Sequence, residues 1–246
     1  MSDAPDKSPE KIARMFDAIA KRYDLLNHLL SLGIDRRWRQ RAVRELGLGS
    51  GSRVLDLCTG TGDLALECLS PGGEEGPVGD GHPHGPFVIG VDFSSAMLRY
   101  GREKLVRMRE RRVALVRGDA MHIPLPDGSV DAVTIGFGIR NVQRPEVAAR
   151  EIVRVLKPGG RLAILEFGTP TVPGLREGYL FYFRRVLPLV GRIISRHNDA
   201  YSYLPASVAA FPSPDDFLAL LRQSGFSRVR VDRLTFGIVY LFVATK

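Results

Sequence analysis

The chain has 246 residues, a length that suits one α/β domain with additions or at most two small domains. Hydrophobic residues make up 44% of the sequence and charged residues 25%, which is ordinary globular usage and allows a sizeable core. The formal net charge is +8, which can favour nucleic acid or an anionic membrane surface, but the arginines are scattered and form no long run.

Simple counts exclude several classes of protein. No window of about 18 consecutive apolar residues occurs, so no membrane span is expected, and Met1–Lys11 lacks the apolar region of a secretory signal. Cys58 and Cys68 are too few for a disulfide framework, and we assign both to packing. Because His82 and His84 would supply only two ligands, we predict no metal site. A cytosolic enzyme is therefore expected.

The first elements in chain order are helices. Ser8 followed by Pro9 suits a helix start, and apolar residues follow at helical spacing from Ile12 onwards, as far as Leu30. A second helix is predicted over 35–46, and Gly47 ends it.

From Arg53 onwards, apolar strands alternate with helices. Strands are predicted at 53–57, 87–92, 113–117, 130–137, 161–167, 229–234 and 236–245, and helices at 62–69, 94–109, 146–156 and 214–224. The sequence Lys157-Pro-Gly-Gly160 is expected to stop the helix before the strand at 161. This alternation predicts an α/β fold with a mostly parallel, doubly wound, seven-stranded sheet.

Two stretches interrupt the alternation. Residues 71–86 are rich in glycine, proline and acids and predict a surface insertion, whereas residues 168–212 are rich in aromatics, arginine and proline and predict a helical insertion that caps a site. We expect one domain over 1–246, made of four segments. These are N-terminal helices (1–48), a cofactor-binding core (50–167), a substrate-cap insertion (168–212), and a closing helix and strands (213–246).

A glycine motif lies between the first predicted strand and the following helix. Gly60, Thr61 and Gly62 would let a ligand approach the backbone, and the N–H groups at the start of the next helix attract an anion. The segment Gly60–Ala65 also satisfies the G-x-G-x-x-A fingerprint of dinucleotide-binding proteins, so this motif alone fits either a methyl donor or NAD.

Acidic residues at three successive strand ends favour S-adenosylmethionine. Asp56 could face the cationic amino-acid end of that donor, and Asp92 could accept hydrogen bonds from ribose hydroxyls. Asp119, followed by Ala120, could receive the adenine amino group. Ligands of open parallel sheets bind outside the carboxyl ends of the strands, where all three acids fall, although any one of them could be only a helix cap.

Longer strings carry a family resemblance. The strings V-L-D-L-C-T-G-T-G-D (54–63), G-V-D-F-S (90–94), R-G-D-A (117–120), D-A-V (131–133) and L-K-P-G-G-R-L (156–162) resemble class I, Rossmann-like methyltransferases. Four more strings are similar to the menaquinone/ubiquinone biosynthesis C-methyltransferases. They are F-D-A-I-A-K-R-Y-D-L-L-N (16–27), G-F-G-I-R-N-V (136–142), L-E-F-G-T-P (165–170) and A-Y-S-Y-L-P-A-S-V-A-A-F-P (200–212). The likeness covers about residues 10–246, and the insertion at 71–86 is its main departure.

The resemblance implies S-adenosylmethionine-dependent methylation of a ring carbon in a polyprenyl hydroquinone. It implies that Arg140 and Asn141 face the quinol oxygens and that Tyr23 hydrogen-bonds the ring oxygen, and we place Gly136 with the cofactor-binding residues. Arg140 could instead form a structural ion pair, and Tyr23 could be a core aromatic. His197 in the cap is a further hypothesis for the proton acceptor.

Several alternatives remain open from the sequence. We favour demethylmenaquinol over the benzoquinol precursor of ubiquinone as substrate, and the pattern is shared by enzymes that act on both. A nucleic-acid methyltransferase is disfavoured because no Asn/Asp-Pro-Pro-aromatic motif follows the fourth strand, so no nucleic-acid partner is expected. An NAD-dependent dehydrogenase and a non-catalytic binding module are further hypotheses. Residues 175–194 interleave aromatics and arginines, which could cover the isoprenoid tail and contact the inner face of the membrane, or could form an ordinary amphipathic cap helix that packs on the sheet. A homodimer is one option for the assembly.

Overall fold

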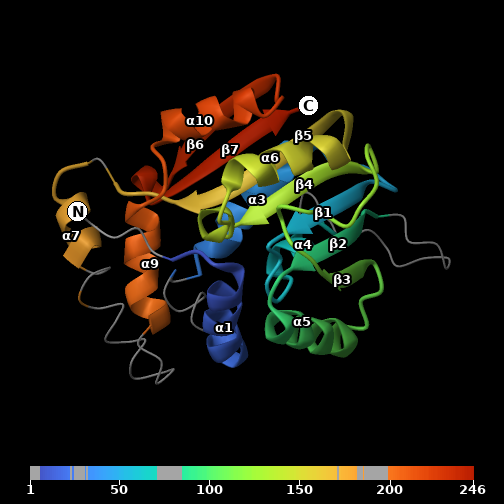
Figure 1. The fold of residues 1–246 in the computed structure, drawn as a ribbon, viewed down its shortest axis with the longest axis horizontal. Helices are drawn as coiled ribbons and strands as arrows, with labels where there is room; N and C mark the ends of the chain where they lie inside the picture. Colours follow the sequence, from blue (N-terminus) through green and yellow to red (C-terminus); the bar gives the residue numbers. More distant parts are fainter. Residues whose placement is uncertain are drawn as a thin grey trace.

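A seven-stranded sheet forms the centre of the molecule, with helices on both faces (Figure 1). The computed structural model describes residues 6–22, 24, 31, 33–70, 85–170, 172–181, 185 and 199–246. Within these residues the strand order is β3-β2-β1-β4-β5-β7-β6, and every pairing is parallel except those that β7 makes with β5 and β6. The mostly parallel, doubly wound sheet predicted from the sequence is confirmed.

Most elements agree with their predicted bounds to within two residues. The strands are β1 (Arg53–Leu57), β2 (Phe87–Asp92), β3 (Val113–Arg117), β4 (Val130–Gly136), β5 (Leu156–Phe167), β6 (Arg228–Leu234) and β7 (Val239–Thr245). The helices are α1 (Pro9–Ile19), α3 (Asp35–Leu46), α4 (Asp63–Glu67), α5 (Ser95–Met108), α6 (Pro145–Val155), α7 (Leu175–Phe181), α9 (Asp199–Ala209) and α10 (Pro214–Gln223). Three 3-10 turns are η1 (Ala20–Arg22), η2 (Ile139–Asn141) and η4 (Thr235–Gly237).

The prediction for the start of the fifth strand was wrong. Helix α6 does end before Lys157-Pro-Gly-Gly160, but β5 begins at Leu156 rather than at Arg161. Leu156 pairs with Val130, and the register shifts before the regular pairing of Ala132 with Arg161. The glycines are therefore accommodated in an irregular strand start, because pairing with β4 provides hydrogen bonds that local sequence does not reveal.

The last strand also begins later than predicted. Thr235 and Phe236 both have positive φ angles, of 47° and 57°, and they form the turn η4, so β7 starts only at Val239. The indole N–H of Trp38 donates a hydrogen bond of 2.8 Å to the Thr235 hydroxyl. A contact with helix α3, far away in the sequence, thus supports a turn that the apolar pattern presents as strand.

Alternating strand residues divide the core into two clusters, one on each face of the sheet. Leu55 and its neighbours face the helices α6 and α10, where Ile152 and Phe217 are buried. Val54 and the other residues of opposite parity face α3, α4 and α5, where Trp38 is buried. A parallel sheet buried on both faces has near-continuous apolar strands, which is the pattern of these strands in the sequence.

Helices α1 and α9 lie side by side at one end of the sheet, and α7 lies beyond α9 (Figure 1). Ile19 and Ala20 form a small apolar cluster there with Met97 of α5 and Tyr179 of α7. The first part of the chain is therefore packed against the helix that follows β2. No helix in the described ranges is long and apolar enough to cross a membrane.

Candidate active site

The glycine motif forms a tight turn between β1 and α4. Gly60 and Gly62 have positive φ angles of 57° and 85°, and the Gly62 N–H donates a hydrogen bond of 2.9 Å to the Thr59 carbonyl. Glycine takes this backbone conformation without the steric cost that a Cβ atom brings. The turn therefore delivers the start of α4 directly to the carboxyl ends of the strands.

Asp92 joins the end of β2 to this turn. One oxygen of its carboxylate accepts a hydrogen bond of 2.8 Å from the Gly60 N–H, and the other accepts one of 2.8 Å from the Ser94 N–H. Burial raises the pKa of Asp92 above its ordinary value. The carboxylate lines a pocket, and each oxygen keeps a second lone pair for a ligand hydroxyl.

Asp119 and Ala120 lie on the same pocket, just beyond β3. Asp119 accepts a hydrogen bond of 2.8 Å from the Met121 N–H, and its second oxygen lies 3.8 Å from Nδ1 of His122. Gly118 precedes them, and a Cβ atom there would lie 2.9 Å from a methyl group of Val91. Close backbone packing therefore holds the Asp119 turn against β2.

The pocket contains about 770 Å³ of empty space, counted out to its open mouth. Six of the residues predicted from the sequence line it, namely Gly60, Asp92, Asp119, Ala120, Gly136 and Asn141. The structure thus collects, at one edge of the sheet, residues that lie more than 80 positions apart in the chain.

Asp56 lies in β1, close to the glycine turn. Its side chain is fully buried, and it accepts hydrogen bonds from the hydroxyls of Thr59 (2.5 Å) and Thr134 (2.8 Å). It is absent from the described residues that line the pocket. Burial raises the pKa of Asp56 to about 6 although the two threonines oppose the shift. In the described structure the carboxylate therefore supports the glycine turn through Thr59, and its contact with the amino-acid end of the donor stays a prediction.

Thr61 and Gly62 also lie behind the pocket wall rather than in it. The buried Thr61 hydroxyl donates a hydrogen bond to Asp24, and Gly62 occupies the N-cap position of α4. Neither is among the described lining residues. Their contribution to ligand binding stays a prediction. In the described structure they would act indirectly, by supporting the turn that places Gly60 in the pocket.

Arg140 forms the buried ion pair that the sequence left open as an alternative. Its Nη1 lies 2.7 Å from Oε1 of Glu166 and also donates to the carbonyl of Phe137, and its backbone N–H donates to Oε2 of Glu166 at 3.2 Å. The neighbouring Asn141 lines the pocket instead, and its Oδ1 is buried with no hydrogen-bond partner in the described structure. The two adjacent residues therefore have different roles.

The predictions for Tyr23 and His197 are not tested, because both residues lie outside the described part of the chain. His122 lies beside Asp119, and its side chain is 78% exposed. The catalytic roles of Arg140, Asn141 and Tyr23 stay predictions.

The sequence prediction missed the part played by the N-terminal segment. Lys7, Pro9, Ile12 and Phe16 all line the pocket, so the segment that begins the described chain covers it. No local pattern marks these residues as ligand neighbours. Glu166 was also missed, although a single carboxylate within the apolar run of β5 signals a buried charge that needs a partner.

Comparison with known proteins now adds to this geometry. A family model described as the ubiE/COQ5 methyltransferase family matches residues 5–246. The chain belongs to the ubiE/COQ5 methyltransferase family. It is 48% identical, over 96% of its length and 97% of the relative's, to a ubiquinone/menaquinone biosynthesis C-methyltransferase of Geobacter sp. (strain M21). It is 47% identical to a demethylmenaquinone methyltransferase of Thermus thermophilus, over 94% of this chain and all of that one. Identity to the Staphylococcus aureus enzyme of the same name is 39%, over 96% of this chain and 93% of that one.

Solved structures share the fold. A methyltransferase from Aquifex aeolicus that depends on S-adenosylmethionine superposes with a TM-score of 0.58 at 21% identity, over 84% of this chain and 88% of that one. A similar protein from Thermotoga maritima gives 0.62 at 21% identity, over 95% and 99%. The chain is thus a methyltransferase of the class I, Rossmann-like fold, with S-adenosylmethionine as its methyl donor. Membership of this family rules out the dehydrogenase hypothesis.

Proposed function

We propose that this ubiE/COQ5 family enzyme methylates a ring carbon of a polyprenyl hydroquinone and converts demethylmenaquinol to menaquinol. The relatives from Thermus thermophilus and Staphylococcus aureus support this substrate, because both are named demethylmenaquinone methyltransferase. When bound, S-adenosylmethionine supplies an electrophilic sulfonium methyl group, and the pocket residues bind and orient the two reactants.

Asn141 is the observation that carries the proposal. Its Oδ1 is a buried acceptor without a partner in the described structure, and its side chain lines the pocket. A buried acceptor left unpaired costs about 1–3 kcal/mol, so a ligand that donates to it is strongly favoured. A quinol hydroxyl is such a donor, and the neighbouring Phe137 and Val142 supply apolar surface for its ring.

Arg140 acts on the quinol through Asn141 in this proposal. Its guanidinium donates to the carbonyl of Phe137, a residue with a positive φ angle of 58°, and thereby holds the turn that presents Asn141. Lys7 brings a further positive charge to the pocket wall. Burial lowers the pKa of Lys7, whereas the carboxylate of Glu166 opposes this shift. The ammonium group of Lys7 would stabilise a phenolate, which raises electron density on the ring carbon beside it.

A second candidate substrate is the benzoquinol precursor of ubiquinone. The Geobacter relative carries ubiquinone and menaquinone together in its name, so methylation of a 2-polyprenyl-6-methoxy-benzoquinol is the alternative. Both quinols present a hydroxyl to Asn141, and they differ in the second ring of the naphthoquinol.

A direct assay tests the proposal. The purified enzyme, with methyl-labelled S-adenosylmethionine, is offered a short-chain demethylmenaquinol and, separately, a short-chain demethyl-benzoquinol. We expect label in the naphthoquinol, and N141L should reduce it by about tenfold or more, since this variant keeps the side-chain volume but removes the acceptor. Label only in the benzoquinol would favour the alternative, and label in neither would refute the quinol assignment.

We also propose that the enzyme acts in the cytoplasm, at the inner face of the membrane that holds the quinol. Phe181 and Val172, around helix α7, are 65% and 46% exposed, and Arg176 and Arg185 are exposed close to them in the chain. Apolar side chains with arginines suit a surface of anionic lipids. The enzyme is expected to sediment with anionic vesicles but not with neutral ones, and F181S should weaken this binding.

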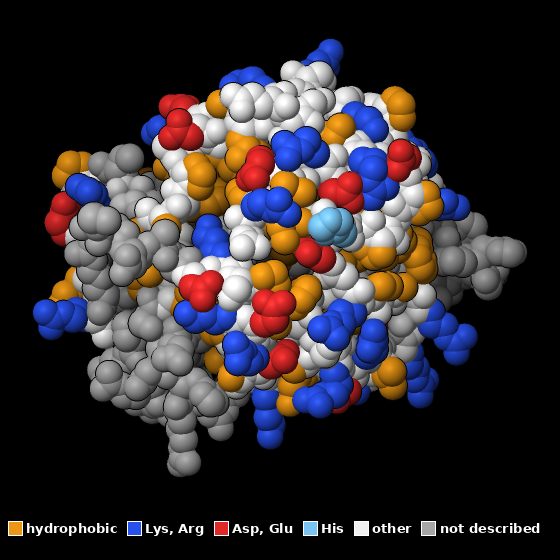
Figure 2. Space-filling view, in the orientation of Figure 1, with side chains coloured by type: hydrophobic (Ala, Val, Ile, Leu, Met, Phe, Trp, Pro, Cys, Tyr) orange, Lys and Arg blue, Asp and Glu red, His pale blue; other side chains and the backbone are white. Residues whose placement is uncertain are grey.

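Figure 2 shows basic and acidic side chains interspersed over the described part of one face, an arrangement that gives little support to a nucleic-acid partner.

A further inference from the structure

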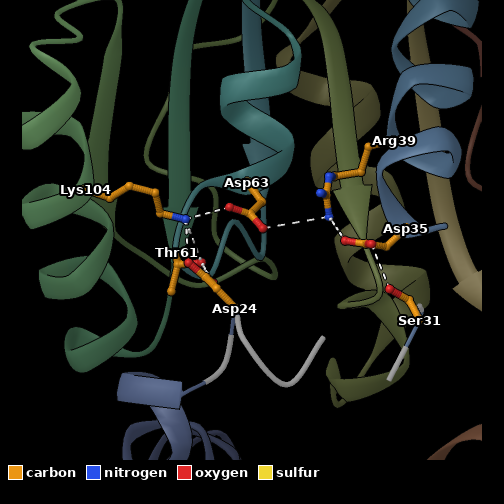
Figure 3. Close-up of polar contacts among 7 residues, drawn as sticks. All are labelled: Asp24, Ser31, Asp35, Arg39, Thr61, Asp63 and Lys104. Atoms are coloured by element: carbon orange, nitrogen blue, oxygen red, sulfur yellow. Dashed lines mark hydrogen bonds and ion pairs between the residues drawn. The ribbon is translucent and has the colours of Figure 1, made fainter. Parts of the chain in front are cut away.

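One lysine of helix α5 joins three separate segments of the chain. Nζ of Lys104 lies 2.7 Å from Oδ2 of Asp24, 2.6 Å from Oδ1 of Asp63 and 3.4 Å from the hydroxyl of Thr61. The Thr61 hydroxyl in turn donates to Oδ1 of Asp24. Figure 3 shows these four side chains converging on one point, and we call them the Lys104 cluster.

The cluster connects the N-terminal segment with the glycine turn. Asp24 follows α1 and η1, Thr61 lies between the two glycines of the turn, and Asp63 is the first residue of α4. Arg39 of α3 extends the network, because its Nη1 lies 3.8 Å from Asp63 and 2.6 Å from Asp35 (Figure 3). One ammonium group thus holds together segments that are not adjacent in the chain.

The Lys104 cluster contains two carboxylates but only one ammonium group. Asp24 and Asp63 both face Lys104, so removal of the ammonium would leave two carboxylates near one hydroxyl. The Lys104 side chain is 16% exposed, but those of Asp24 and Asp63 are 43% and 32% exposed. Ion pairs with this much solvent contribute little to global stability. The contribution expected of the cluster is therefore to geometry, because it fixes one segment relative to another.

Both segments that Lys104 joins contribute residues to the pocket described above, in which Gly60 and Asp92 would hold the methyl donor. On one side, Lys7, Pro9, Ile12 and Phe16 line the pocket, and on the other side Gly60 does so. Lys104 itself is not among the described lining residues.

A second contact connects helix α1 with the start of helix α5. Asp17 of α1 accepts hydrogen bonds from the Ser94 hydroxyl and from the Ala96 N–H at the start of α5. Helix α1 is therefore fastened to α5 by Asp17, and the chain that leaves it is fastened by the Lys104 cluster.

We propose that Lys104 is a positioning residue for the methyl donor, which holds the N-terminal segment and the glycine turn together so that both walls of the pocket are in place. The proposal concerns the donor pocket and does not depend on the identity of the quinol. Its direct consequence is a lower affinity for the donor when the cluster is broken. If the anchored arrangement falls from nearly all molecules to about a tenth, the apparent Kd rises about tenfold.

Calorimetric binding of S-adenosylmethionine and of S-adenosylhomocysteine to the full chain provides the test. K104M keeps the aliphatic stem and removes the charge, and we expect it to raise both Kd values about tenfold. The matched control is K157M, because Lys157 makes a comparable pair of 2.5 Å with Asp131 at the amino end of β4, away from the pocket. K157M is expected to leave both Kd values unchanged, and thermal unfolding shows whether the two variants are equally stable.

Two further variants separate positioning from loss of structure. D24N removes the carboxylate that loses its ion pair with Lys104, whereas Asp63 still lies 3.8 Å from Arg39, so the double variant D24N/K104M should bind the donor more tightly than K104M alone. K104R keeps the charge and should restore most of the wild-type affinity. If K104M fails to fold, as judged by circular dichroism, D24N and K104R carry the test, with an expected rise of about threefold for D24N.

Defined outcomes would overturn the proposal. A Kd for K104M within twofold of the wild type would do so, as would an equal rise for K157M. A double variant that binds no better than K104M would also contradict it. Donor binding is measured without any quinol, so a wrong substrate assignment would appear only in the methylation assay and would leave this result unaffected.

Discussion

The protonation of Asp56 should make stability depend on pH in a way that one substitution removes. Its carboxyl is fully buried and has a pKa of about 6, compared with an ordinary value of 3.8. Because the folded state holds this proton more tightly than the unfolded chain, the carboxyl stabilises the folded state fully below about pH 4. That contribution is lost as the pH rises through about 6.

The magnitude follows from the same two values. The difference between about 6 and 3.8, at about 1.4 kcal/mol per pH unit, corresponds to about 3 kcal/mol. D56N has no proton to lose, and its amide can still bond both threonines, because one hydroxyl donates to the amide oxygen and the other rotates to accept from the amide nitrogen. Because the unfolded carboxyl is already more than half ionised at pH 4, the free energy of unfolding of the wild type, minus that of D56N, should fall by about 2 kcal/mol of this total between pH 4 and pH 7.

Urea denaturation of both proteins at several pH values measures this difference. T134V should have the opposite effect to D56N, because the loss of the Thr134 hydroxyl removes a donor to the carboxylate and should raise the pKa of Asp56 further. In T134V the free energy of unfolding should therefore decrease more between pH 4 and pH 7 than it does in the wild type. Parallel pH profiles for the wild type and D56N would refute the argument, since they would mean that the carboxyl has the same pKa in both states.

Three other substitutions test the pocket and its supports. D92N should raise the Kd for S-adenosylmethionine roughly tenfold to a hundredfold in calorimetry, because a charged acceptor of two backbone N–H groups is lost. G138A should lower the free energy of unfolding by about 1–3 kcal/mol, because the new Cβ would overlap with that of Cys58, and adding C58G should recover most of the loss. R140A should lower it by about 3–5 kcal/mol, because Glu166 would be left buried and unpaired, and E166Q should cost less. Turnover by R140A, measured below its melting temperature, should fall while donor affinity stays nearly constant, and unchanged turnover would remove Arg140 from the proposed mechanism.

The periodicity of the sequence was sufficient for most of the fold. Buried parallel strands are short apolar runs, and the helices between them carry apolar residues at helical spacing, so both can be recognised locally. The two boundaries that failed depend on partners from elsewhere. Leu156 belongs to a strand because Val130 pairs with it. Thr235 lies in a turn instead of the predicted strand, and a hydrogen bond from Trp38 supports that turn.

The acidic residues at the strand ends show what local sequence can and cannot predict about the site. A position at the end of a parallel strand guarantees closeness to the site, and Asp92 and Asp119 do line the pocket. The direction of a side chain at that position depends on its neighbours, and Asp56 turns inward because Thr59 and Thr134 offer hydroxyls to its carboxylate. Thr134 lies 78 positions away, so no local pattern could reveal this bond.

The sequence by itself determined the α/β fold, the glycine turn and the resemblance to the family, because each of these is encoded in short strings whose residues act within one turn or strand. The tertiary structure alone decided which side chains meet. The ion pair of Arg140 with Glu166, the N-terminal cover of the pocket and the Lys104 cluster all join residues from distant segments. Their geometry arises from the packing of helices and strands against each other, and this packing has no signature within any one segment.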